Sequence, residues 1–238
     1  MTNSYQNKVY RKAQKRFYHY EFKKNIADYH NYKDKLEILD LGCGNGDLCF
    51  FLSKKFINSN FYGIDIEKKN IQFALRRSKF LKQKKRFTFI NKSFEKFKTK
   101  KKFDIVIASG FLCFFTDIKK PLNKMIKLIK PKKGKIYLFG DFNSSGVDKI
   151  VKFRNNNRRG TKKWLSGFSS YSIDTIKNYF LKKKFNCKIK KFHLPYNIGS
   201  FNSDPIRSIS RLLSGYGRII FNRANLIFDF HTLIIKRK

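Results

Sequence analysis

The sequence is poor in cysteine, proline and acidic residues, and it contains no long apolar run. Its 238 residues include 4 Cys, 4 Pro and 16 Asp and Glu. The four cysteines, Cys43, Cys49, Cys113 and Cys187, form no C-x-x-C pair, which argues against a zinc site or a disulfide framework. The longest apolar stretch, around residues 105–115, is shorter than the ~20 residues that span a bilayer. The start of the sequence does not resemble a secretory signal. These absences predict a cytoplasmic protein with no metal site and no transmembrane segment.

Basic residues greatly outnumber acidic ones. The chain has 55 Lys and Arg and a formal net charge of +39. A surface this positive attracts polyanions such as nucleic acid, acidic lipid or acidic glycan. Abundant Lys, Asn, Ile, Phe and Tyr are also what an adenine- and thymine-rich genome produces, although that bias alone does not explain so few acidic residues. The basic runs are spread over different predicted elements, which modestly favours compositional bias over a selected anionic partner.

The chain alternates apolar strands with helical stretches from residue 36 onward. This order is typical of a parallel sheet with crossover helices, and 238 residues suit one domain with embellishments. The sequence predicts strands at 37–41, 60–64, 87–91, 103–108, 135–139, 187–194 and 228–236, and helices at 47–56, 67–81, 118–129 and 172–183. We therefore expect one α/β domain over residues 36–238.

Three segments fall outside this alternation. Residues 1–35 mix basic and aromatic residues at roughly helical spacing, which predicts an amphipathic helix that caps the core or a helical lid over a ligand. Residues 142–170 are polar, and residues 154–160 within them are expected to form a loop. Residues 195–225 are long for a connection between paired strands, and long connections are usually functional or disordered. We expect a substrate-side insertion there.

The most informative segment is Ile38–Leu48, which reads ILDLGCGNGDL. An apolar run leads into Asp40, glycines then alternate with other residues, and an apolar stretch resumes. This pattern predicts a buried strand that turns sharply into a helix, with glycines that permit positive φ and a close approach of ligand to backbone. The alternating glycines are Gly42, Gly44 and Gly46.

A dinucleotide site is the nearest alternative for this turn. Its fingerprint is G-x-G-x-x-G, in which the third glycine allows close packing of helix on strand. Here the third glycine comes one residue early, at Gly46. Asp47 occupies the position where the fingerprint has its third glycine. A carboxylate beside a pyrophosphate is repulsive. NAD or FAD is therefore the weaker interpretation.

The glycine turn and the segments after it resemble class I S-adenosylmethionine-dependent methyltransferases. The resemblance covers about Leu36 to Asp141, and the tail would complete the sheet. It implies a Rossmann-like, seven-stranded, mostly parallel sheet with helices on both faces and an antiparallel last strand. It also implies S-adenosylmethionine as cofactor, with its methionine part against the glycine loop, which includes Cys43, and beside Asp40. A carboxylate suits the positive charge of that cofactor.

The resemblance implies further cofactor contacts. Asp65, after the second strand, matches the acidic residue that accepts hydrogen bonds from both ribose hydroxyls, and its alternative role is to cap the next helix. Ile66 would pack on the adenine. Ser93 and Phe94 stand where the family often has an acidic residue for the adenine amine, so serine or a backbone amide would make that contact. Ser109 would face the methyl group, and the lack of an Asn-Pro-Pro-Tyr-like sequence there argues against adenine or glutamine N-methylation.

Methyl transfer is an in-line displacement, in which the enzyme holds a dehydrated nucleophile ~3–3.5 Å from the methyl carbon. A hydroxyl or ammonium nucleophile also needs a base. Candidates are Asp141 after the fifth strand, His193 at the end of the sixth, and His19 or His30 in the N-terminal segment. Each also has a structural interpretation as a turn cap or a locally satisfied residue. The sequence does not choose among them, and positioning alone can supply most of the rate.

Three functions remain open from the sequence. The favoured one is methyl transfer to an oxygen or nitrogen of a small molecule or glycan precursor. The second is an RNA methyltransferase that uses the basic surface and the Arg158-Arg159 loop. The third is a non-catalytic protein that binds the cofactor, because a fold does not guarantee an activity. Nothing in the sequence specifies the oligomeric state.

Overall fold

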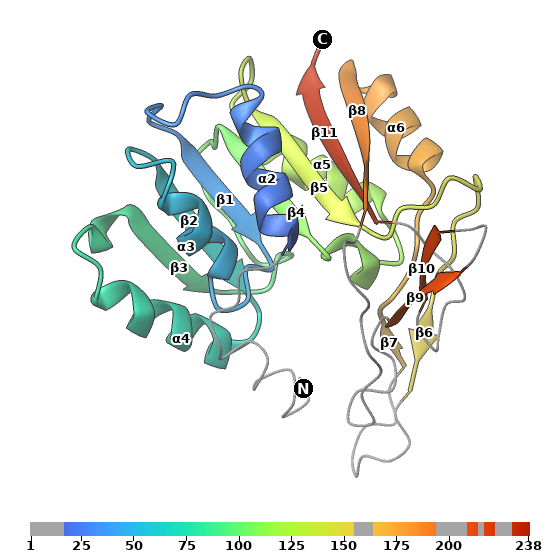
Figure 1. Cartoon of the computed structure of the whole chain (residues 1–238), viewed down its shortest axis with the longest axis horizontal. Helices are drawn as coiled ribbons and strands as arrows, with labels where there is room; N and C mark the ends of the chain where they lie inside the picture. Colours follow the sequence, from blue (N-terminus) through green and yellow to red (C-terminus); the bar gives the residue numbers. More distant parts are fainter. Residues whose placement is uncertain (1–16, 155–163, 194–208, 214–216, 222–229) are drawn as a thin grey trace.

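A seven-stranded sheet forms the centre of the molecule (Figure 1). The computed structural model describes residues 17–154, 164–193, 209–213, 217–221 and 230–238. The strand order is β3-β2-β1-β4-β5-β11-β8. The strands are β1 (Glu37–Leu41), β2 (Asn60–Asp65), β3 (Phe87–Asn91), β4 (Ile105–Ser109), β5 (Lys135–Gly140), β8 (Phe185–Phe192) and β11 (Phe230–Arg237).

The first five strands of this sheet run parallel, and β11 lies antiparallel to both of its neighbours, β5 and β8. Five residues of β4 pair in parallel with β5, because both strands are apolar runs buried on both faces. The prediction of a mostly parallel seven-stranded sheet with an antiparallel last strand is confirmed.

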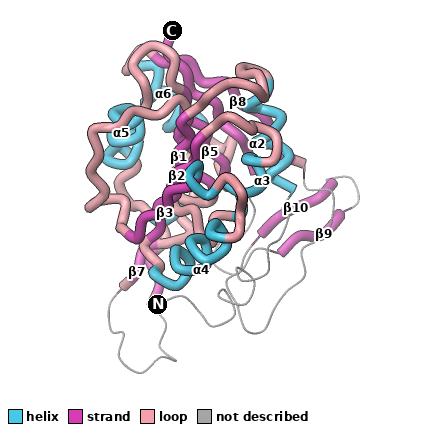
Figure 2. The backbone as a smooth tube through the Cα atoms, turned by 90° about the vertical axis from the view of Figure 1, so that its left-hand side faces the viewer, coloured by secondary structure: helices cyan, strands magenta, loops and turns pink. Residues whose placement is uncertain are grey.

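Helices cover both faces of the sheet, as predicted (Figure 2). One face carries α2 (Phe17–Ala27), α3 (Asp47–Ser53) and α4 (Lys68–Lys79), and the other carries α5 (Lys119–Leu128) and α6 (Ile173–Lys182). Two short 3-10 turns occur at Lys84–Arg86 and Leu112–Phe114. Helix α6 starts at Ser172, whose hydroxyl accepts a hydrogen bond from the Thr175 amide at 3.0 Å. This cap satisfies one of the amides that a helix start leaves without a partner.

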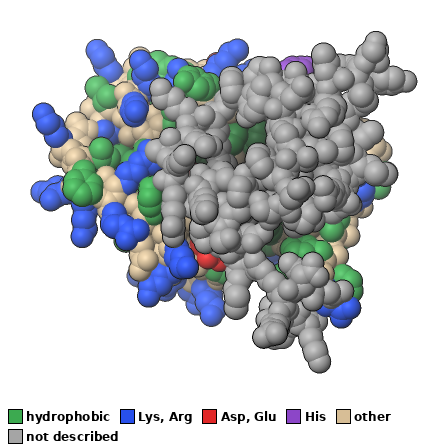
Figure 3. Space-filling model, turned by 60° about the horizontal axis from the view of Figure 1, so that its bottom comes forward, with side chains coloured by type: hydrophobic (Ala, Val, Ile, Leu, Met, Phe, Trp, Pro, Cys, Tyr) green, Lys and Arg blue, Asp and Glu red, His purple; other side chains and the backbone are tan. Residues whose placement is uncertain are grey.

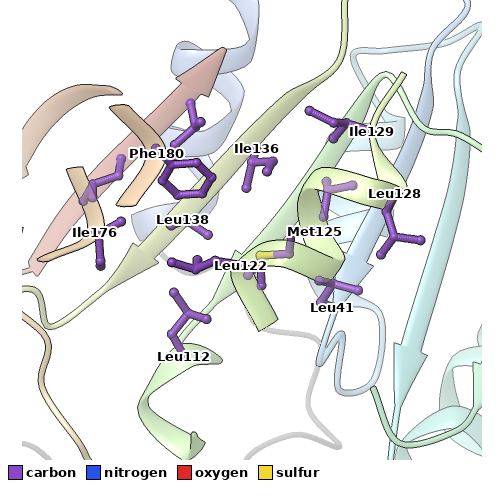
Figure 4. Packing of buried hydrophobic residues seen from close by; sticks show 14 of the residues in the cluster. Leu41, Leu112, Leu122, Met125, Leu128, Ile129, Ile136, Leu138, Ile176 and Phe180 are labelled. Atoms are coloured by element: carbon purple, nitrogen blue, oxygen red, sulfur yellow. The ribbon is translucent and has the colours of Figure 1, made fainter. Parts of the chain in front are cut away.

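The core has one apolar layer on each side of the sheet. In the first, Leu122, Met125 and Leu128 of α5 pack against Ile136 and Leu138 of β5 (Figure 4). The second layer is rich in aromatic rings, and α2 contributes Phe22 and Ile26 to it. Full burial of one such side chain stabilises the fold by about 1.5–3 kcal/mol. The two layers bury both faces of the sheet and so hold the ends of its parallel strands in fixed positions.

The described part of residues 1–35 belongs to this core. Phe22 and Ile26 are fully buried, and Tyr18 stacks on Phe139 of β5 with ring centroids 5.2 Å apart. Helix α2 is thus the amphipathic helix that the sequence predicts for the core. The lid prediction covers residues 1–35, of which residues 1–16 lie outside the described part of the chain, and it stays a prediction.

Two small β-sheets were missed by sequence reasoning. β6 (Lys152–Phe153) and β7 (Leu165–Ser166) pair within the polar stretch 142–170, on either side of the loop predicted at 154–160. β9 (Ile209–Leu213) and β10 (Gly217–Phe221) pair within the expected insertion at 195–225. The two-residue strands β6 and β7 give too few alternating positions for a periodicity to be read. In the described parts of the chain, no helix has the length and apolarity that crossing a bilayer requires.

Candidate cofactor and catalytic site

The predicted site residues gather at the carboxyl ends of the parallel strands. Gly42 follows β1, Asp65 ends β2, Ser109 ends β4 and Asp141 follows β5. Because β1 pairs with β2 and β4, and β4 pairs with β5, these four positions lie on adjacent strands. Open α/β sheets bind ligands at this edge, where the strand order reverses. The edge faces downward in Figure 1.

The glycine loop, residues 42–46, is hydrogen-bonded to the end of β2. The amides of Gly42 and Cys43 donate to the Ile64 carbonyl at 2.9 and 3.0 Å, and the Gly44 amide donates to Asp65 Oδ2 at 2.8 Å. The φ angles of Gly42, Gly44 and Gly46 are 69°, 54° and 78°. Residues with a Cβ rarely adopt such angles. The predicted glycine turn is confirmed, and its shape depends on the neighbouring strand.

Gly63 in the middle of β2 is a further requirement of this loop, and sequence reasoning missed it. A Cβ at this position would lie 2.6 Å from Cys43 Sγ and 2.7 Å from the ring of Phe89. The available signal was a glycine inside a predicted strand, which often marks a close approach of other atoms. The thiol of Cys43 therefore points onto β2 in the core.

Phe94 also faces the core, since it is 6% exposed and its ring lies edge-on to Phe111 at 5.3 Å between centroids. The side chains of Cys43 and Phe94 therefore face the core, and the Cys43 amide and carbonyl already bond Ile64 and Gly46, so their predicted cofactor contacts stay predictions. Ser93 is half-buried, and its hydroxyl accepts from the Lys96 amide at 3.4 Å. Ile66, predicted to pack on adenine, is 69% exposed. These two residues stay predictions.

Asp65 supports the turn at both of its carboxylate oxygens. Oδ2 accepts from the Gly44 amide and Oδ1 accepts from the Glu67 amide, each at 2.8 Å. The second bond closes a turn just before α4, whose N-cap residue is Glu67, so Asp65 itself does not cap the helix. The Asn70 side chain also hydrogen-bonds this carboxylate, so three of its about four lone-pair sites are in use. Burial raises the pKa of Asp65.

Asp40 lies under the glycine loop and is 3% exposed. Burial, together with the charge of Asp65, raises the pKa of Asp40 to about 8. The Cys49 thiol, which sequence reasoning did not assign a role, donates to Asp40 Oδ2 at 3.9 Å and opposes this shift. A cation placed beside the loop would favour the ionised carboxylate.

We expect cofactor binding to depend on pH, because the pKa of Asp40 is raised. Below about pH 8 the carboxyl is largely protonated, and a ligand that carries ammonium and sulfonium charges binds the ionised form better. We therefore expect proton release on binding at pH 6.5, and tighter binding as the pH rises toward 7.5. Calorimetry at pH 6.5 in two buffers of different ionisation enthalpy measures this release. Asp40→Asn is expected to abolish it, and an unchanged release in that variant would assign the proton to another group.

The charge of Asp47 is a weaker reason against a dinucleotide than the sequence suggests, because this carboxylate is paired. The Arg77 guanidinium of α4 donates to Asp47 Oδ1 and lies over the ring of Phe50, 4.3 Å from its centroid. A paired carboxylate repels a pyrophosphate much less than an isolated one. Asp47 thus helps to fix α4 on α3, and its charge does not by itself exclude a phosphate ligand.

The edge of the sheet formed by the carboxyl ends of the parallel strands is called the cofactor edge below. Among the candidate bases, Asp141 lies at this edge. Its backbone carbonyl accepts from the Ser170 hydroxyl at 2.9 Å. Burial raises the pKa of Asp141 to about 7, while the charge of Lys149 opposes the shift. A base with a pKa near the working pH is best suited to general base catalysis. His193 follows the end of β8 at the same edge of the sheet and is exposed.

The other two histidines are placed away from this edge or closed off from it. His19 is 1% exposed, and its ring lies 4.7 Å from that of Tyr18 and 5.3 Å from that of Phe51. The prediction of His19 as a base is therefore not supported, because its ring is enclosed between α2 and α3. His30 lies 3.4 Å from Lys135 Nζ at the start of β5, the opposite edge of the sheet.

Comparisons with known proteins identify the family. Residues 32–166, more than half of the chain, match the family model described as a methyltransferase domain. The malonyl-[acyl-carrier protein] O-methyltransferase of Acetivibrio thermocellus is 22% identical over 205 residues, which cover 76% of this chain and 70% of that protein. Three further curated relatives align over 28–43% of their own length.

Solved structures share the fold. An S-adenosylmethionine-dependent methyltransferase from Clostridium acetobutylicum superposes with a TM-score of 0.59 at 13% identity, over 99% of both chains. The glycopeptide N-methyltransferase MtfA complexed with S-adenosylmethionine gives 0.56 at 12% identity, over 92% of this chain and 86% of that one. The glycine turn, the sheet order and the family match agree. The chain therefore belongs to the methyltransferase domain family and is an enzyme that uses S-adenosylmethionine as its methyl donor.

Proposed function

We propose that this enzyme transfers the methyl group to an oxygen or nitrogen atom of a small molecule or glycan precursor, with Asp141 as the base. The observation that carries the proposal is the placement of Asp141, whose pKa is raised to about 7, directly after β5, the strand that pairs with the strand of Ser109. A neutral nucleophile loses its proton as it attacks, and a carboxylate of this pKa accepts that proton near pH 7.

The proposed cofactor contacts follow from the loop geometry. S-adenosylmethionine supplies an electrophilic methyl group on a cationic sulfur. Asp65 places a carboxylate at the end of β2 for the ribose hydroxyls, and the positive charge of the cofactor would favour the ionised form of Asp40 under the loop. The glycine amides of the loop are already fixed, so little ordering is needed when the cofactor binds.

Space for the acceptor exists beside Ser109. Gly110 is exposed, has a φ of 59°, and a Cβ built on it would meet no atom within 4 Å among the described residues. Burial in this region is strong enough to raise the pKa of Cys113 to about 12, so its thiol stays protonated and is no competing nucleophile. This arrangement supports an acceptor held between the ends of β4 and β5.

Two observations support a small acceptor. The Lys and Arg side chains visible in Figure 3 lie around the described rim of this face, and the basic runs of the sequence fall on different elements. The relatives named above act on a malonyl group attached to a carrier protein and on a glycopeptide. A nucleic-acid enzyme gains affinity from a basic surface concentrated along the path of the phosphates.

RNA is the second candidate, favoured by one specific feature. Trp164 is 61% exposed, and the Arg154 guanidinium lies over its ring, 5.4 Å from the centroid. Exposed aromatic rings with arginine neighbours bind the bases of single strands by stacking. This pair lies at the ends of β6 and β7, in the segment between β5 and α6.

The substrate class can be tested directly. The full chain is incubated with methyl-labelled S-adenosylmethionine and, separately, with RNA, protein, lipid and small-metabolite fractions of cells. We expect label in the small-metabolite or glycan-precursor fraction. The Asp141→Asn variant serves as the matched control for enzymatic transfer. Label that enters RNA alone would replace the first candidate by the second, and cofactor binding without transfer to any fraction would show a non-catalytic protein.

A further inference from the structure

A basic hollow lies at the amino ends of the parallel strands, opposite the cofactor edge. Its volume is about 590 Å³, and its twelve lining residues come from four separate segments. These are Tyr29, His30, Asp34, Lys35, Leu36, Asp104, Lys132, Lys133, Gly134, Lys135, Lys236 and Arg237. The hollow borders the end of β11, near the C-terminal mark at the top of Figure 1.

Cations are concentrated in this hollow beyond the high average of the chain. Six of the twelve lining residues are Lys or Arg, compared with 55 of 238 in the whole sequence. Compositional bias predicts about three cations among twelve residues of this chain. The hollow therefore has about twice the expected number, arranged on a concave surface where their potentials add.

The two carboxylates in the hollow already have other partners. Asp104 Oδ2 accepts from Lys130 Nζ and from the Glu37 amide, each at 2.8 Å. Asp34 Oδ2 accepts from the Asn31 amide at 2.9 Å and lies 3.7 Å from His30 Nδ1. None of these contacts of Asp104 and Asp34 involves one of the six Lys and Arg residues that line the hollow. Even with both carboxylates counted against them, four positive charges of the lining remain uncompensated.

Lys135 and Lys236 form the centre of this charge. They stand directly opposite each other in the β5–β11 register, and their ammonium groups lie 5.2 and 5.4 Å from the centroid of the same ring, Tyr29. Like charges directly opposite each other on paired strands destabilise the sheet. Burial and the charge of Lys236 lower the pKa of Lys135. A bound anion would relieve this repulsion.

His30 completes the charged surroundings. Its Nε2 lies 3.4 Å from Lys135 Nζ, and burial together with the charge of Lys135 lowers the pKa of His30. The imidazole is therefore neutral at pH 7 and does not add to the repulsion. The remaining cations, Lys35, Lys132, Lys133 and Arg237, surround the Lys135–Lys236 pair on the lining.

We propose that this hollow is a binding site for a small phosphate-rich anion, such as the di- or triphosphate group of a nucleotide or free polyphosphate. Four uncompensated charges call for a multiply charged ligand, and a single carboxylate would neutralise one of them. The volume lies within the range of small-ligand sites, ~300–1,000 Å³. A strand of six residues spans about 20 Å, so the site is separate from the cofactor edge and does not compete with S-adenosylmethionine.

Titration of the full chain with sodium tripolyphosphate tests the proposal. We expect saturable binding by calorimetry at 50 mM salt, with an affinity that falls at least tenfold in the double variant Lys135→Gln/Lys236→Gln. The matched control is Lys79→Gln/Lys82→Gln, which removes the same charge from two exposed lysines at the far side of the sheet beside β3. An equal loss in both double variants would show general attraction to a basic surface and overturn the site.

Melting temperature and S-adenosylmethionine binding are measured as well, to show that the variants fold and that the two sites are separate. The melting temperature of the Lys135→Gln/Lys236→Gln variant without ligand is expected to equal or exceed that of the wild type, because a repulsion is removed. If that variant does not fold, Lys133→Gln/Arg237→Gln at the same lining replaces it. Binding of S-adenosylmethionine should be unchanged, which separates this site from the methyl-transfer site. A single-stranded RNA octamer that binds more tightly than tripolyphosphate through the same two lysines would overturn the small-ligand proposal.

Discussion

Replacement of Asp65 by Ala is expected to weaken S-adenosylmethionine binding by about 100-fold. The change removes the acceptor for the Gly44 amide, which shapes the glycine loop, and the proposed acceptor for the ribose hydroxyls. Hydrogen bonds to charged groups contribute roughly 1.5–3 kcal/mol each, so the loss of two corresponds to about 3 kcal/mol, or two orders of magnitude in Kd. Titration calorimetry with the cofactor and with its demethylated product measures the change.

Two control variants separate the carboxylate of Asp65 from charge in general. Glu67→Gln removes a carboxylate two residues away and keeps the backbone amide that donates a hydrogen bond to Asp65 Oδ1. We therefore expect the Kd for the cofactor to change less than threefold. Asp65→Asn keeps the shape of the side chain and replaces one acceptor oxygen by a donor, so we expect a loss close to that of Asp65→Ala. Cofactor binding that survives both Asp65 variants, in a chain with an unchanged melting temperature, would disprove the ribose assignment.

Replacement of Asp141 by Asn is expected to lower kcat by about 10²–10³-fold, within the range that general base catalysis contributes. The amide keeps the size of the side chain but cannot accept the nucleophile's proton. In the wild type, kcat should rise with pH and level off above about 7, because the raised pKa of Asp141 leaves it protonated at lower pH. The variant should lose that dependence and keep its affinity for S-adenosylmethionine within about twofold.

His193 is the matched control for Asp141. It lies at the same edge of the sheet, is exposed, and was an equal candidate from sequence. His193→Gln is expected to change kcat by less than twofold. If the histidine variant loses the rate and the pH dependence while Asp141→Asn keeps both, the proton acceptor is His193 and the proposed role of Asp141 is wrong.

The sheet was predictable because its strands are apolar runs bounded by strong turn signals. Ile105–Ser109 is buried almost throughout, and the Lys130-Pro131 break before β5 separates helix from strand without ambiguity. Helix ends were less exact: the helix predicted at 47–56 ends at Ser53. Ends of helices depend on the last carbonyls finding partners, which periodicity does not report.

The parts of the site that escaped prediction depend on contacts between distant segments. Cys49 contacts Asp40 across a strand–helix turn, and Gly63 makes room for Cys43 of the glycine loop and Phe89 of β3. The burial of His19 depends on α3 lying against α2. The basic hollow combines residues from four segments, so no local motif contains it. One-dimensional patterns identify the loop that holds the cofactor, while the supporting residues follow from the packed structure.

The position of β11 between β5 and β8 sets an order of events during synthesis on the ribosome. Roughly 90 residues separate the end of β5 from the start of β11, and both β5 and β8 form their ladder with β11. At about 5–20 residues per second, translation leaves the edge of β5 without its final neighbour for roughly 4–18 s. A nascent chain with an uncovered apolar strand edge is prone to pair with other chains. Chaperone protection during that interval would be worth more to this enzyme than to one whose sheet closes in chain order.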